Sequence, residues 1–296
     1  MSEALSWERD GADWPNREAS HFVVSSGLRW HCQRMGRGPP LLLLHGTGAA
    51  THTWRDLAPL LAGRFTVIAP DLPGHGFTAP LDAKRLSLSG MAAAVGDLLQ
   101  TLEVTPGLVI GHSAGAAVLA RMTLDGRIDP ACIVCLNGAL LPFRGLAGPF
   151  YAPLAKLLAL NPLVPRLFAM GAASPSAVDR LIRNTGSSVD ATGRDLYGRL
   201  LRSPAHLAGA LRMMANWDLA SLERDLPRLG QRLLLVACGD DGAVPAADAF
   251  RVRDEVPGAE VIYLRKLGHL GHEERPQLFA DIVVRTAVGA GILAAG

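Results

Sequence analysis

The chain has 296 residues, which allows one or two domains and a core large enough to fold without disulfide or metal staples. Hydrophobic residues make up 49% of the sequence and charged residues 19%, and the formal net charge is +2. Neither a basic block nor an acidic tail is present, so the charge pattern does not point to a nucleic-acid partner.

Residues 1–20 are polar and lack the charged-then-apolar pattern of a signal peptide. No window of the sequence approaches the roughly 18 uncharged apolar residues of a membrane span. We therefore expect a cytoplasmic protein. Peripheral contact with a membrane stays open, because one internal segment, residues 140–219, is strongly apolar.

Short apolar runs alternate with helix-like stretches on both sides of that segment. A hairpin is expected at residues 21–34, around Ser25-Ser26-Gly27. Buried strands are expected at residues 41–44, 65–69, 108–110, 132–136, 233–237 and 261–264. Helices are expected at residues 54–61, 89–102, 114–124, 246–254 and 276–286. Such runs are apolar on both faces, as in parallel strands covered by helices, so the pattern predicts an α/β fold with a mostly parallel sheet.

Residues 140–219 interrupt this alternation with short helix-like stretches that Pro, Gly and Asn separate. An insertion after the fourth central strand would lie over the carboxyl edge of the sheet, where open α/β sheets bind ligands. We interpret it as a helical lid inserted into a core of residues 1–139 and 220–296. A helical layer that only packs on the core is the alternative. The lid residues expected to line an apolar pocket are Phe143, Phe150, Tyr151, Met213, Met214 and Trp217.

The strongest chemical signal is Gly111-His112-Ser113-Ala114-Gly115, between an apolar strand and an Ala-rich helix. In a Gly-x-Ser-x-Gly motif the serine sits on a sharp strand-to-helix turn, and the glycines keep side chains out of that turn. The start of the following helix favours developing negative charge. The motif in this setting predicts that Ser113 is a nucleophile.

A serine hydroxyl needs a base to take its proton, and the base needs an orienting acid. On this type of fold the chain order is serine, acid, histidine. Asp241 follows a late strand and is the preferred acid, with Asp240 as the alternative. His269 follows the last strand and is the preferred base, whereas His272 is expected to shape the loop or to contact a helix carboxylate.

Acyl transfer also requires donors for the oxyanion. The expected donors are the backbone amides of Ala114, directly after the nucleophile, and of Thr47, in a glycine-containing loop after an early strand. His45 is expected to brace that loop. Asp71 and His75 lie in another turn at the same edge, and we interpret them as structural rather than as substrate contacts.

Metal and redox sites receive little support. Cys132 and Cys135 form a Cys-x-x-Cys pattern, but they lie in an apolar strand, where positions three apart point to opposite faces. We therefore expect both to be core residues. The histidines lack convincing ligand spacing and no glycine-rich loop suits a nucleotide phosphate, so we predict neither a metal nor a cofactor.

The sequence resembles the α/β-hydrolase fold superfamily from about residue 27 to residue 284. The motifs that carry this resemblance are His45-Gly46-Thr47-Gly48, Asp71-Leu72-Pro73-Gly74-His75-Gly76, Gly111-His112-Ser113-Ala114-Gly115, Asp241 and Gly268-His269. The resemblance implies a hydrolase fold with a Ser-Asp-His triad. Ser113 argues against the dehalogenase branch of the superfamily, which uses an aspartate at that position.

Nearly the whole chain is also similar to the magnesium chelatase accessory proteins of bacteriochlorophyll biosynthesis. The matching segments are residues 13–23, 28–31, 46–57 and 267–276. This resemblance implies a role in photosynthetic pigment synthesis, near the insertion of magnesium into protoporphyrin IX. It also implies a tetrapyrrole ligand and magnesium chelatase subunits as partners.

Three functions fit these observations. The preferred one is a serine hydrolase that cleaves an ester or similar acyl bond of an apolar small molecule. The second is a binding module with an idle triad, which holds a porphyrin or docks on the chelatase. The third is a carbon–carbon bond hydrolase, which uses the same triad. The intact Ser113, Asp241 and His269 positions favour the first.

Overall fold

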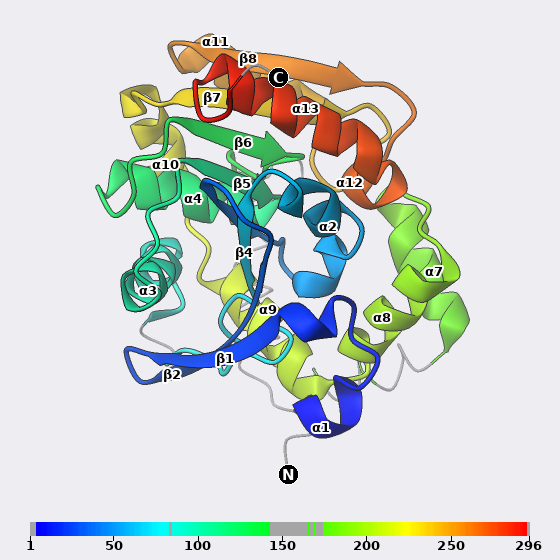
Figure 1. Ribbon diagram of the computed structural model, residues 1–296. Helices are drawn as coiled ribbons and strands as arrows, with labels where there is room; N and C mark the ends of the chain where they lie inside the picture. The colour runs from blue at the N-terminus through cyan, green and yellow to red at the C-terminus, as the bar shows by residue number, and fades with distance from the viewer. Residues whose placement is uncertain (1–3, 83–84, 143–164, 166–168, 170–173, 295–296) are drawn as a thin grey trace.

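The computed structural model describes residues 4–82, 85–142, 165, 169 and 174–294. Its centre is an eight-stranded sheet with the order β1-β2-β4-β3-β5-β6-β7-β8 (Figure 1). The strands are β1 (Ser20–Ser25), β2 (Leu28–Met35), β3 (Pro40–Leu44), β4 (Thr66–Pro70), β5 (Leu108–His112), β6 (Cys132–Leu136), β7 (Arg232–Cys238) and β8 (Ala259–Leu264). Strand β2 pairs antiparallel with β1 and β4, and the pairs from β4 to β8 are parallel. The predicted α/β-hydrolase architecture is confirmed.

Helices cover both faces of the sheet. Helices α2 (Leu57–Ala62) and α13 (Pro276–Gly289) pack together on one face, whereas α3 (Leu88–Thr101) and α4 (Ala114–Leu124) pack together on the other (Figure 1). Helix α11 (Ala246–Glu255) packs against β7 and β8. The predicted helix at 54–61 is shorter than expected, because Thr51–Trp54 form a separate 3₁₀ turn, η2.

Successive strand residues enter different cores, which explains why the strands are apolar on both faces. Leu41 and Leu43 pack in the core beneath α2 and α13, and Leu42 and Leu44 pack in the core beneath α3 and α4. Cys132 likewise lies in the core beneath α2 and α13, and Cys135 in the core beneath α3 and α4. All four cysteines of the chain are buried free thiols. Burial raises the pKa of the Cys132 thiol to about 11, so it stays protonated at neutral pH.

Four helices occupy the described part of the chain between β6 and β7. They are α7 (Pro175–Asn184), α8 (Ala191–Leu201), α9 (Pro204–Ala215) and α10 (Leu219–Asp225). Each begins after a Ser or Asp whose side chain accepts a backbone N–H of the first turn; these residues are Ser174, Asp190, Ser203 and Asp218. Helix α10 was not predicted, and it packs on α4. Phe143, Phe150 and Tyr151 lie outside the described residues.

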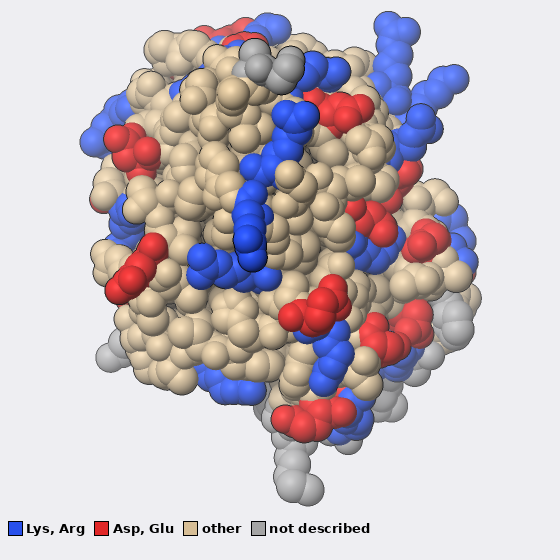
Figure 2. All heavy atoms as spheres, viewed as in Figure 1, with Lys and Arg blue, Asp and Glu red and all other residues tan. Residues whose placement is uncertain are grey.

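Short helical turns complete the described chain. They are α1 (Trp7–Asp10), η1 (Arg17–Ala19), η4 (Leu226–Arg228) and α12 (Gly271–Glu274). Within the described ranges, no helix combines the length and the apolar character that crossing a bilayer requires. Figure 2 shows basic and acidic side chains interspersed over the face it presents, separated by broad uncharged areas.

Candidate active site

Ser113 occupies a strained turn between β5 and α4. Its backbone angles are φ 51° and ψ −119°, a region that costs a non-glycine residue free energy. A Cβ added at Gly111 would lie 2.4 Å from the amide nitrogen of Ala116, and one at Gly115 would lie 2.2 Å from the carbonyl oxygen of Leu44. Both positions therefore require glycine, and the turn directs the half-buried Ser113 away from the sheet.

Hydrogen bonds to the neighbouring strand hold this turn in place. The Ser113 amide donates to the carbonyl oxygen of Leu136 at 3.0 Å, and the Ala139 amide donates to the carbonyl oxygen of Ser113 at 3.0 Å. Leu136 ends β6, so the serine is fixed to two adjacent strands of the sheet. This support keeps the strained backbone in one conformation.

Asp241 and His269 meet at the carboxyl edge of the sheet. The Nδ1 atom of His269 donates to Oδ2 of Asp241 at 2.8 Å, and Oδ2 also accepts from the side-chain amide of Asn137 at 2.6 Å. The other carboxylate oxygen accepts the backbone amides of Ala243 at 2.7 Å and Val244 at 2.8 Å. These donors hold Asp241 in one orientation. Because Nδ1 of His269 donates to Asp241, Nε2 is the ring nitrogen that is free to act as a base.

Asp240, the alternative acid, has different surroundings. It is exposed, and its backbone amide donates to the carbonyl oxygen of Leu267 at 2.9 Å. Asp241, whose side chain is fully buried, is the aspartate that contacts His269.

The loop after β3 carries Thr47, one of the expected oxyanion donors. His45 braces this loop, because its Nδ1 donates to the carbonyl oxygen of Gly46 at 2.8 Å and its Nε2 accepts the Leu72 amide at 2.8 Å. Burial lowers the pKa of His45, so the ring is neutral as these bonds require. The other expected donor, the Ala114 amide, is the first of α4, and such amides have no partner within their own helix.

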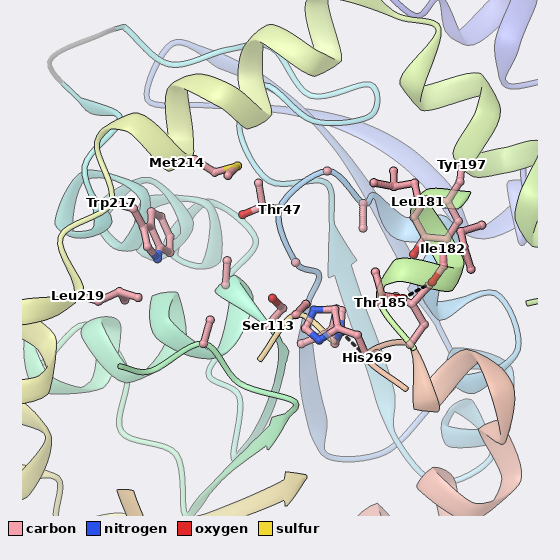
Figure 3. Close-up of a pocket in the computed structure, with 18 of the residues that line it drawn as sticks. Thr47, Ser113, Leu181, Ile182, Thr185, Tyr197, Met214, Trp217, Leu219 and His269 are labelled. Atoms are coloured by element: carbon pink, nitrogen blue, oxygen red, sulfur yellow. Dashed lines mark hydrogen bonds between the residues drawn. The ribbon is translucent and has the colours of Figure 1, made fainter. Parts of the chain in front are cut away.

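Ser113, His269 and Thr47 all border one cavity of about 560 Å³ (Figure 3). Ser113 and His269 lie side by side at its floor, and Thr47 stands above them (Figure 3). Most of the lining is apolar, and the segment 140–219 contributes residues from two sides of the cavity (Figure 3). The residues of segment 140–219 that line it are Pro142, Leu181, Ile182, Thr185, Tyr197, Leu201, Met214, Trp217, Asp218 and Leu219.

The pocket prediction was incomplete. Met214 and Trp217 line the cavity as expected, but Met213 does not: it is fully buried in the core, with its sulfur 3.6 Å from the Thr47 hydroxyl. Sequence reasoning also missed Leu181 and Tyr197, on α7 and α8. Their helices repeat apolar residues at helical spacing, but that pattern does not tell which neighbour the apolar face meets.

A buried polar network beside the cavity was not predicted. The Glu273 carboxylate forms an ion pair with Arg55 and accepts the hydroxyls of Tyr197 at 2.7 Å and Thr53 at 2.6 Å. Since Thr53 donates to Glu273, its oxygen accepts from Nε2 of His272 at 2.8 Å. Burial lowers the pKa of His272 to about 3, so it is neutral. His272 thus helps to shape the loop, through a hydroxyl rather than a carboxylate.

Asp71 has the structural role that was expected. One oxygen of its fully buried carboxylate accepts the Thr51 amide at 2.7 Å. The other accepts the Phe77 amide at 2.9 Å and contacts Nδ1 of His31 at 2.8 Å. The pKa of this carboxyl is lowered by His31 and the Phe77 amide in spite of burial, so it remains ionised. His75 does not line the cavity; its Nδ1 lies 3.2 Å from the carbonyl oxygen of Pro73.

In the described part of the chain, no group of three or more His, Cys, Asp or Glu side chains is placed to hold a metal ion. The groups that border the site are a serine, a histidine held by a carboxylate, two backbone amides and an apolar cavity. This set of groups suits acyl transfer through a covalent intermediate.

The chain belongs to the alpha/beta hydrolase family, whose sequence model matches residues 41–282. It is 40% identical over 269 residues to the magnesium-chelatase 30 kDa subunit of Rhodobacter capsulatus, a match that spans 88% of this chain and 92% of that protein. It is 30% identical over 254 residues to a pyrrolizixenacetamide deacetylase of Xenorhabdus hominickii, spanning 82% of this chain and 89% of that enzyme.

Solved structures show the same fold. An esterase from Exiguobacterium antarcticum superposes with a TM-score of 0.74 over 90% of this chain and 98% of that one, at 17% sequence identity. At this identity the likeness concerns the fold alone. Together with the family match, it confirms the α/β-hydrolase resemblance.

Proposed function

We propose that the protein is a serine hydrolase that cleaves an ester or similar acyl bond of an apolar substrate. The observation that carries this proposal is the 2.8 Å hydrogen bond between Asp241 and His269, beside Ser113 on the floor of the cavity. In this assignment Ser113 is the nucleophile, His269 the general base and Asp241 the orienting acid. The segment 140–219 is the lid over the site.

The reaction has two halves. The Ser113 hydroxyl gives its proton to Nε2 of His269 while its oxygen attacks the carbonyl carbon, and the amides of Thr47 and Ala114 bind the resulting oxyanion. When the intermediate collapses, the leaving group departs with the proton from His269. Water then adds to the acyl-enzyme by the same route, and the carboxylic acid product and free Ser113 are released.

The proposed substrate is an apolar ester large enough to use the cavity of about 560 Å³, which lies within the usual range for small-molecule sites. Similarity to a protein named as a magnesium-chelatase subunit supports a tetrapyrrole ester as this substrate. We therefore propose a role near magnesium insertion into protoporphyrin IX in bacteriochlorophyll synthesis.

A second candidate is a module without catalytic activity that binds a porphyrin or the chelatase itself. The observation that favours it is the 40% identity to a relative whose name describes a chelatase subunit rather than a hydrolase. The complete Ser113, His269 and Asp241 arrangement favours the hydrolase, because an idle site has no need for a strained serine and an oriented histidine.

The first test is labelling with a fluorophosphonate, read by mass spectrometry of intact protein and peptides. We expect wild type to be modified on Ser113, with no modification in Ser113→Ala and a loss of more than about 100-fold in rate for His269→Ala. The control variant is His272→Gln, because His272 is a neighbouring histidine whose ring faces Thr53. Folded wild type that stays unlabelled would reject the hydrolase, and porphyrin titration and chelatase pull-downs would then test the binding module.

A further inference from the structure

Helix α9 touches the core through one face, and this face meets the loop that carries Thr47. His206, Gly209 and Met213 lie three and seven positions apart along the helix, so they share a side. All three are buried, although the helix belongs to the segment interpreted as a lid. They contact two turns of the core, one that contains Thr47 and Gly48 and one that contains Gly74 and Gly76.

His206 joins these two turns. Its Nε2 lies 3.1 Å from the carbonyl oxygen of Gly48, and its Nδ1 accepts the Gly76 amide at 3.1 Å. A carbonyl oxygen only accepts, so Nε2 carries the proton and the ring is the neutral tautomer. Burial lowers the pKa of His206 to about 4, in agreement with this state.

The other two residues of this face each contact one of these two turns. A Cβ at Gly209 would lie 2.1 Å from the carbonyl oxygen of Gly74, so the helix and the turn meet backbone to backbone. The sulfur of Met213 is 3.6 Å from the Thr47 hydroxyl. Residues of α9 therefore contact both Thr47 and Gly48. Gly48 has φ +77°, a backbone conformation that favours glycine, so the position of the adjacent Thr47 depends on the conformation of this loop.

We propose that His206 is a positioning residue that fixes the Thr47 amide in the oxyanion hole by holding Gly48 from helix α9. This inference rests on the proposed hydrolase function. It means that the oxyanion site is complete when α9 is docked, so the lid region contributes to the chemistry as well as to the cavity. His206 touches neither the substrate nor the reacting atoms.

The test compares His206→Leu and His206→Gln with wild type, using p-nitrophenyl butyrate as the probe. Leucine fills the space but leaves the Gly48 carbonyl and the Gly76 amide without a partner, whereas the glutamine carboxamide offers both a donor and an acceptor. We expect kcat of His206→Leu to fall about 10- to 100-fold with KM changed less than about twofold, since loss of a whole oxyanion donor costs about 10²–10³-fold. His206→Gln should recover most of the loss.

A trifluoromethyl ketone inhibitor separates positioning from general damage, because its tetrahedral adduct places an oxyanion in the hole. Its affinity should fall in parallel with kcat in His206→Leu, and recover in His206→Gln. The matched control is Arg212→Gln, which changes an exposed residue of the same helix and should leave both quantities unchanged. Circular dichroism and thermal unfolding verify that each variant is folded.

Several results would overturn the inference. One is a folded His206→Leu variant with wild-type kcat and wild-type inhibitor affinity. Another is an equal loss of kcat in His206→Leu and His206→Gln. If His206→Leu does not fold, Gly209→Ala provides the second route, because its methyl group must push α9 away from Gly74. An unchanged kcat in folded Gly209→Ala also rejects it. A wild type that neither hydrolyses the ester nor labels on Ser113 rejects the proposed function instead.

Discussion

Asp240 and Asp241 are adjacent in the sequence but have opposite surroundings. The Asp241 side chain is buried and receives hydrogen bonds from His269, Asn137 and two backbone amides, whereas Asp240 is exposed. Asn137 directly follows β6, a position at which an acid could also reach the histidine. Here its amide donates to Asp241, so it supports the acid instead of replacing it.

We therefore expect substitutions of the two aspartates to have different effects on kcat. Asp241→Asn should lower kcat for an ester probe by about 10³–10⁴-fold, because an amide cannot hold the His269 tautomer or stabilise its cation. Asp240→Asn should stay within about twofold of wild type, since its side chain faces solvent. Steady-state kinetics of both variants check this assignment, and the reverse order of effects would transfer the role to Asp240.

At the scale of elements, the inserted segment between β6 and β7 is joined to the sheet domain by polar contacts as well as by apolar packing. Helix α8 supplies Tyr197, which donates to Glu273 at 2.7 Å, and its capping residue Asp190 pairs with Arg55 at 3.1 Å. Arg55 and Glu273 both belong to the core and are almost completely buried. Helix α8 is therefore attached to a buried ion pair of the core.

Removing one member of this pair should destabilise the fold. Glu273→Gln leaves the Arg55 guanidinium buried, and its remaining anionic partners among the described residues are the exposed Asp56 and Asp190, so we expect a loss of about 3 kcal/mol in the free energy of unfolding. The control is Glu260→Gln, which removes the exposed pair with Arg232 and should cost less than about 1 kcal/mol. Urea unfolding measures both, and equal effects would contradict the importance of burial.

For the whole molecule, buried histidines make stability depend on pH. His206 lies among His45, His75 and the ionised Asp71, and burial lowers its pKa from 6.5 to about 4. The unfolded chain therefore binds a proton at this residue below about pH 6.5, whereas the folded chain does so only near pH 4. Stability is highest above this window and falls as the pH decreases through it.

The contribution of His206 can be isolated by difference. Between pH 7.5 and pH 5 we expect wild type to lose about 1–2 kcal/mol more stability than His206→Gln, because glutamine does not titrate. His272 and Asp71 also weaken the fold on acidification, but they are present in both proteins and cancel in the comparison. Urea unfolding at both pH values gives the result, and parallel losses in the two proteins would show that His206 does not contribute.

The sequence by itself determined the sheet and the order of the chemical groups. Strands such as β3 and β6 were visible because residues on both of their faces enter a core, which gives continuous apolar runs. The turn at Ser113 was visible because the strand, the Gly-x-Ser-x-Gly motif and the helix follow one another in the sequence, although the Leu44 carbonyl that requires glycine at 115 lies on another strand. Asp241 and His269 followed from the strand ends, since carboxyl ends of parallel strands share one edge.

Only the tertiary structure decided how distant segments meet. The ion pair of Arg55 with Glu273 spans 218 positions, and the contact of His206 with Gly48 spans 158. Neither has a local pattern, because a side chain's partner across the fold leaves no periodicity in the sequence around it. The same reason hid the direction of Met213 and the pocket role of Tyr197: helical spacing defines an apolar face, but packing alone decides whether that face meets the core or a cavity.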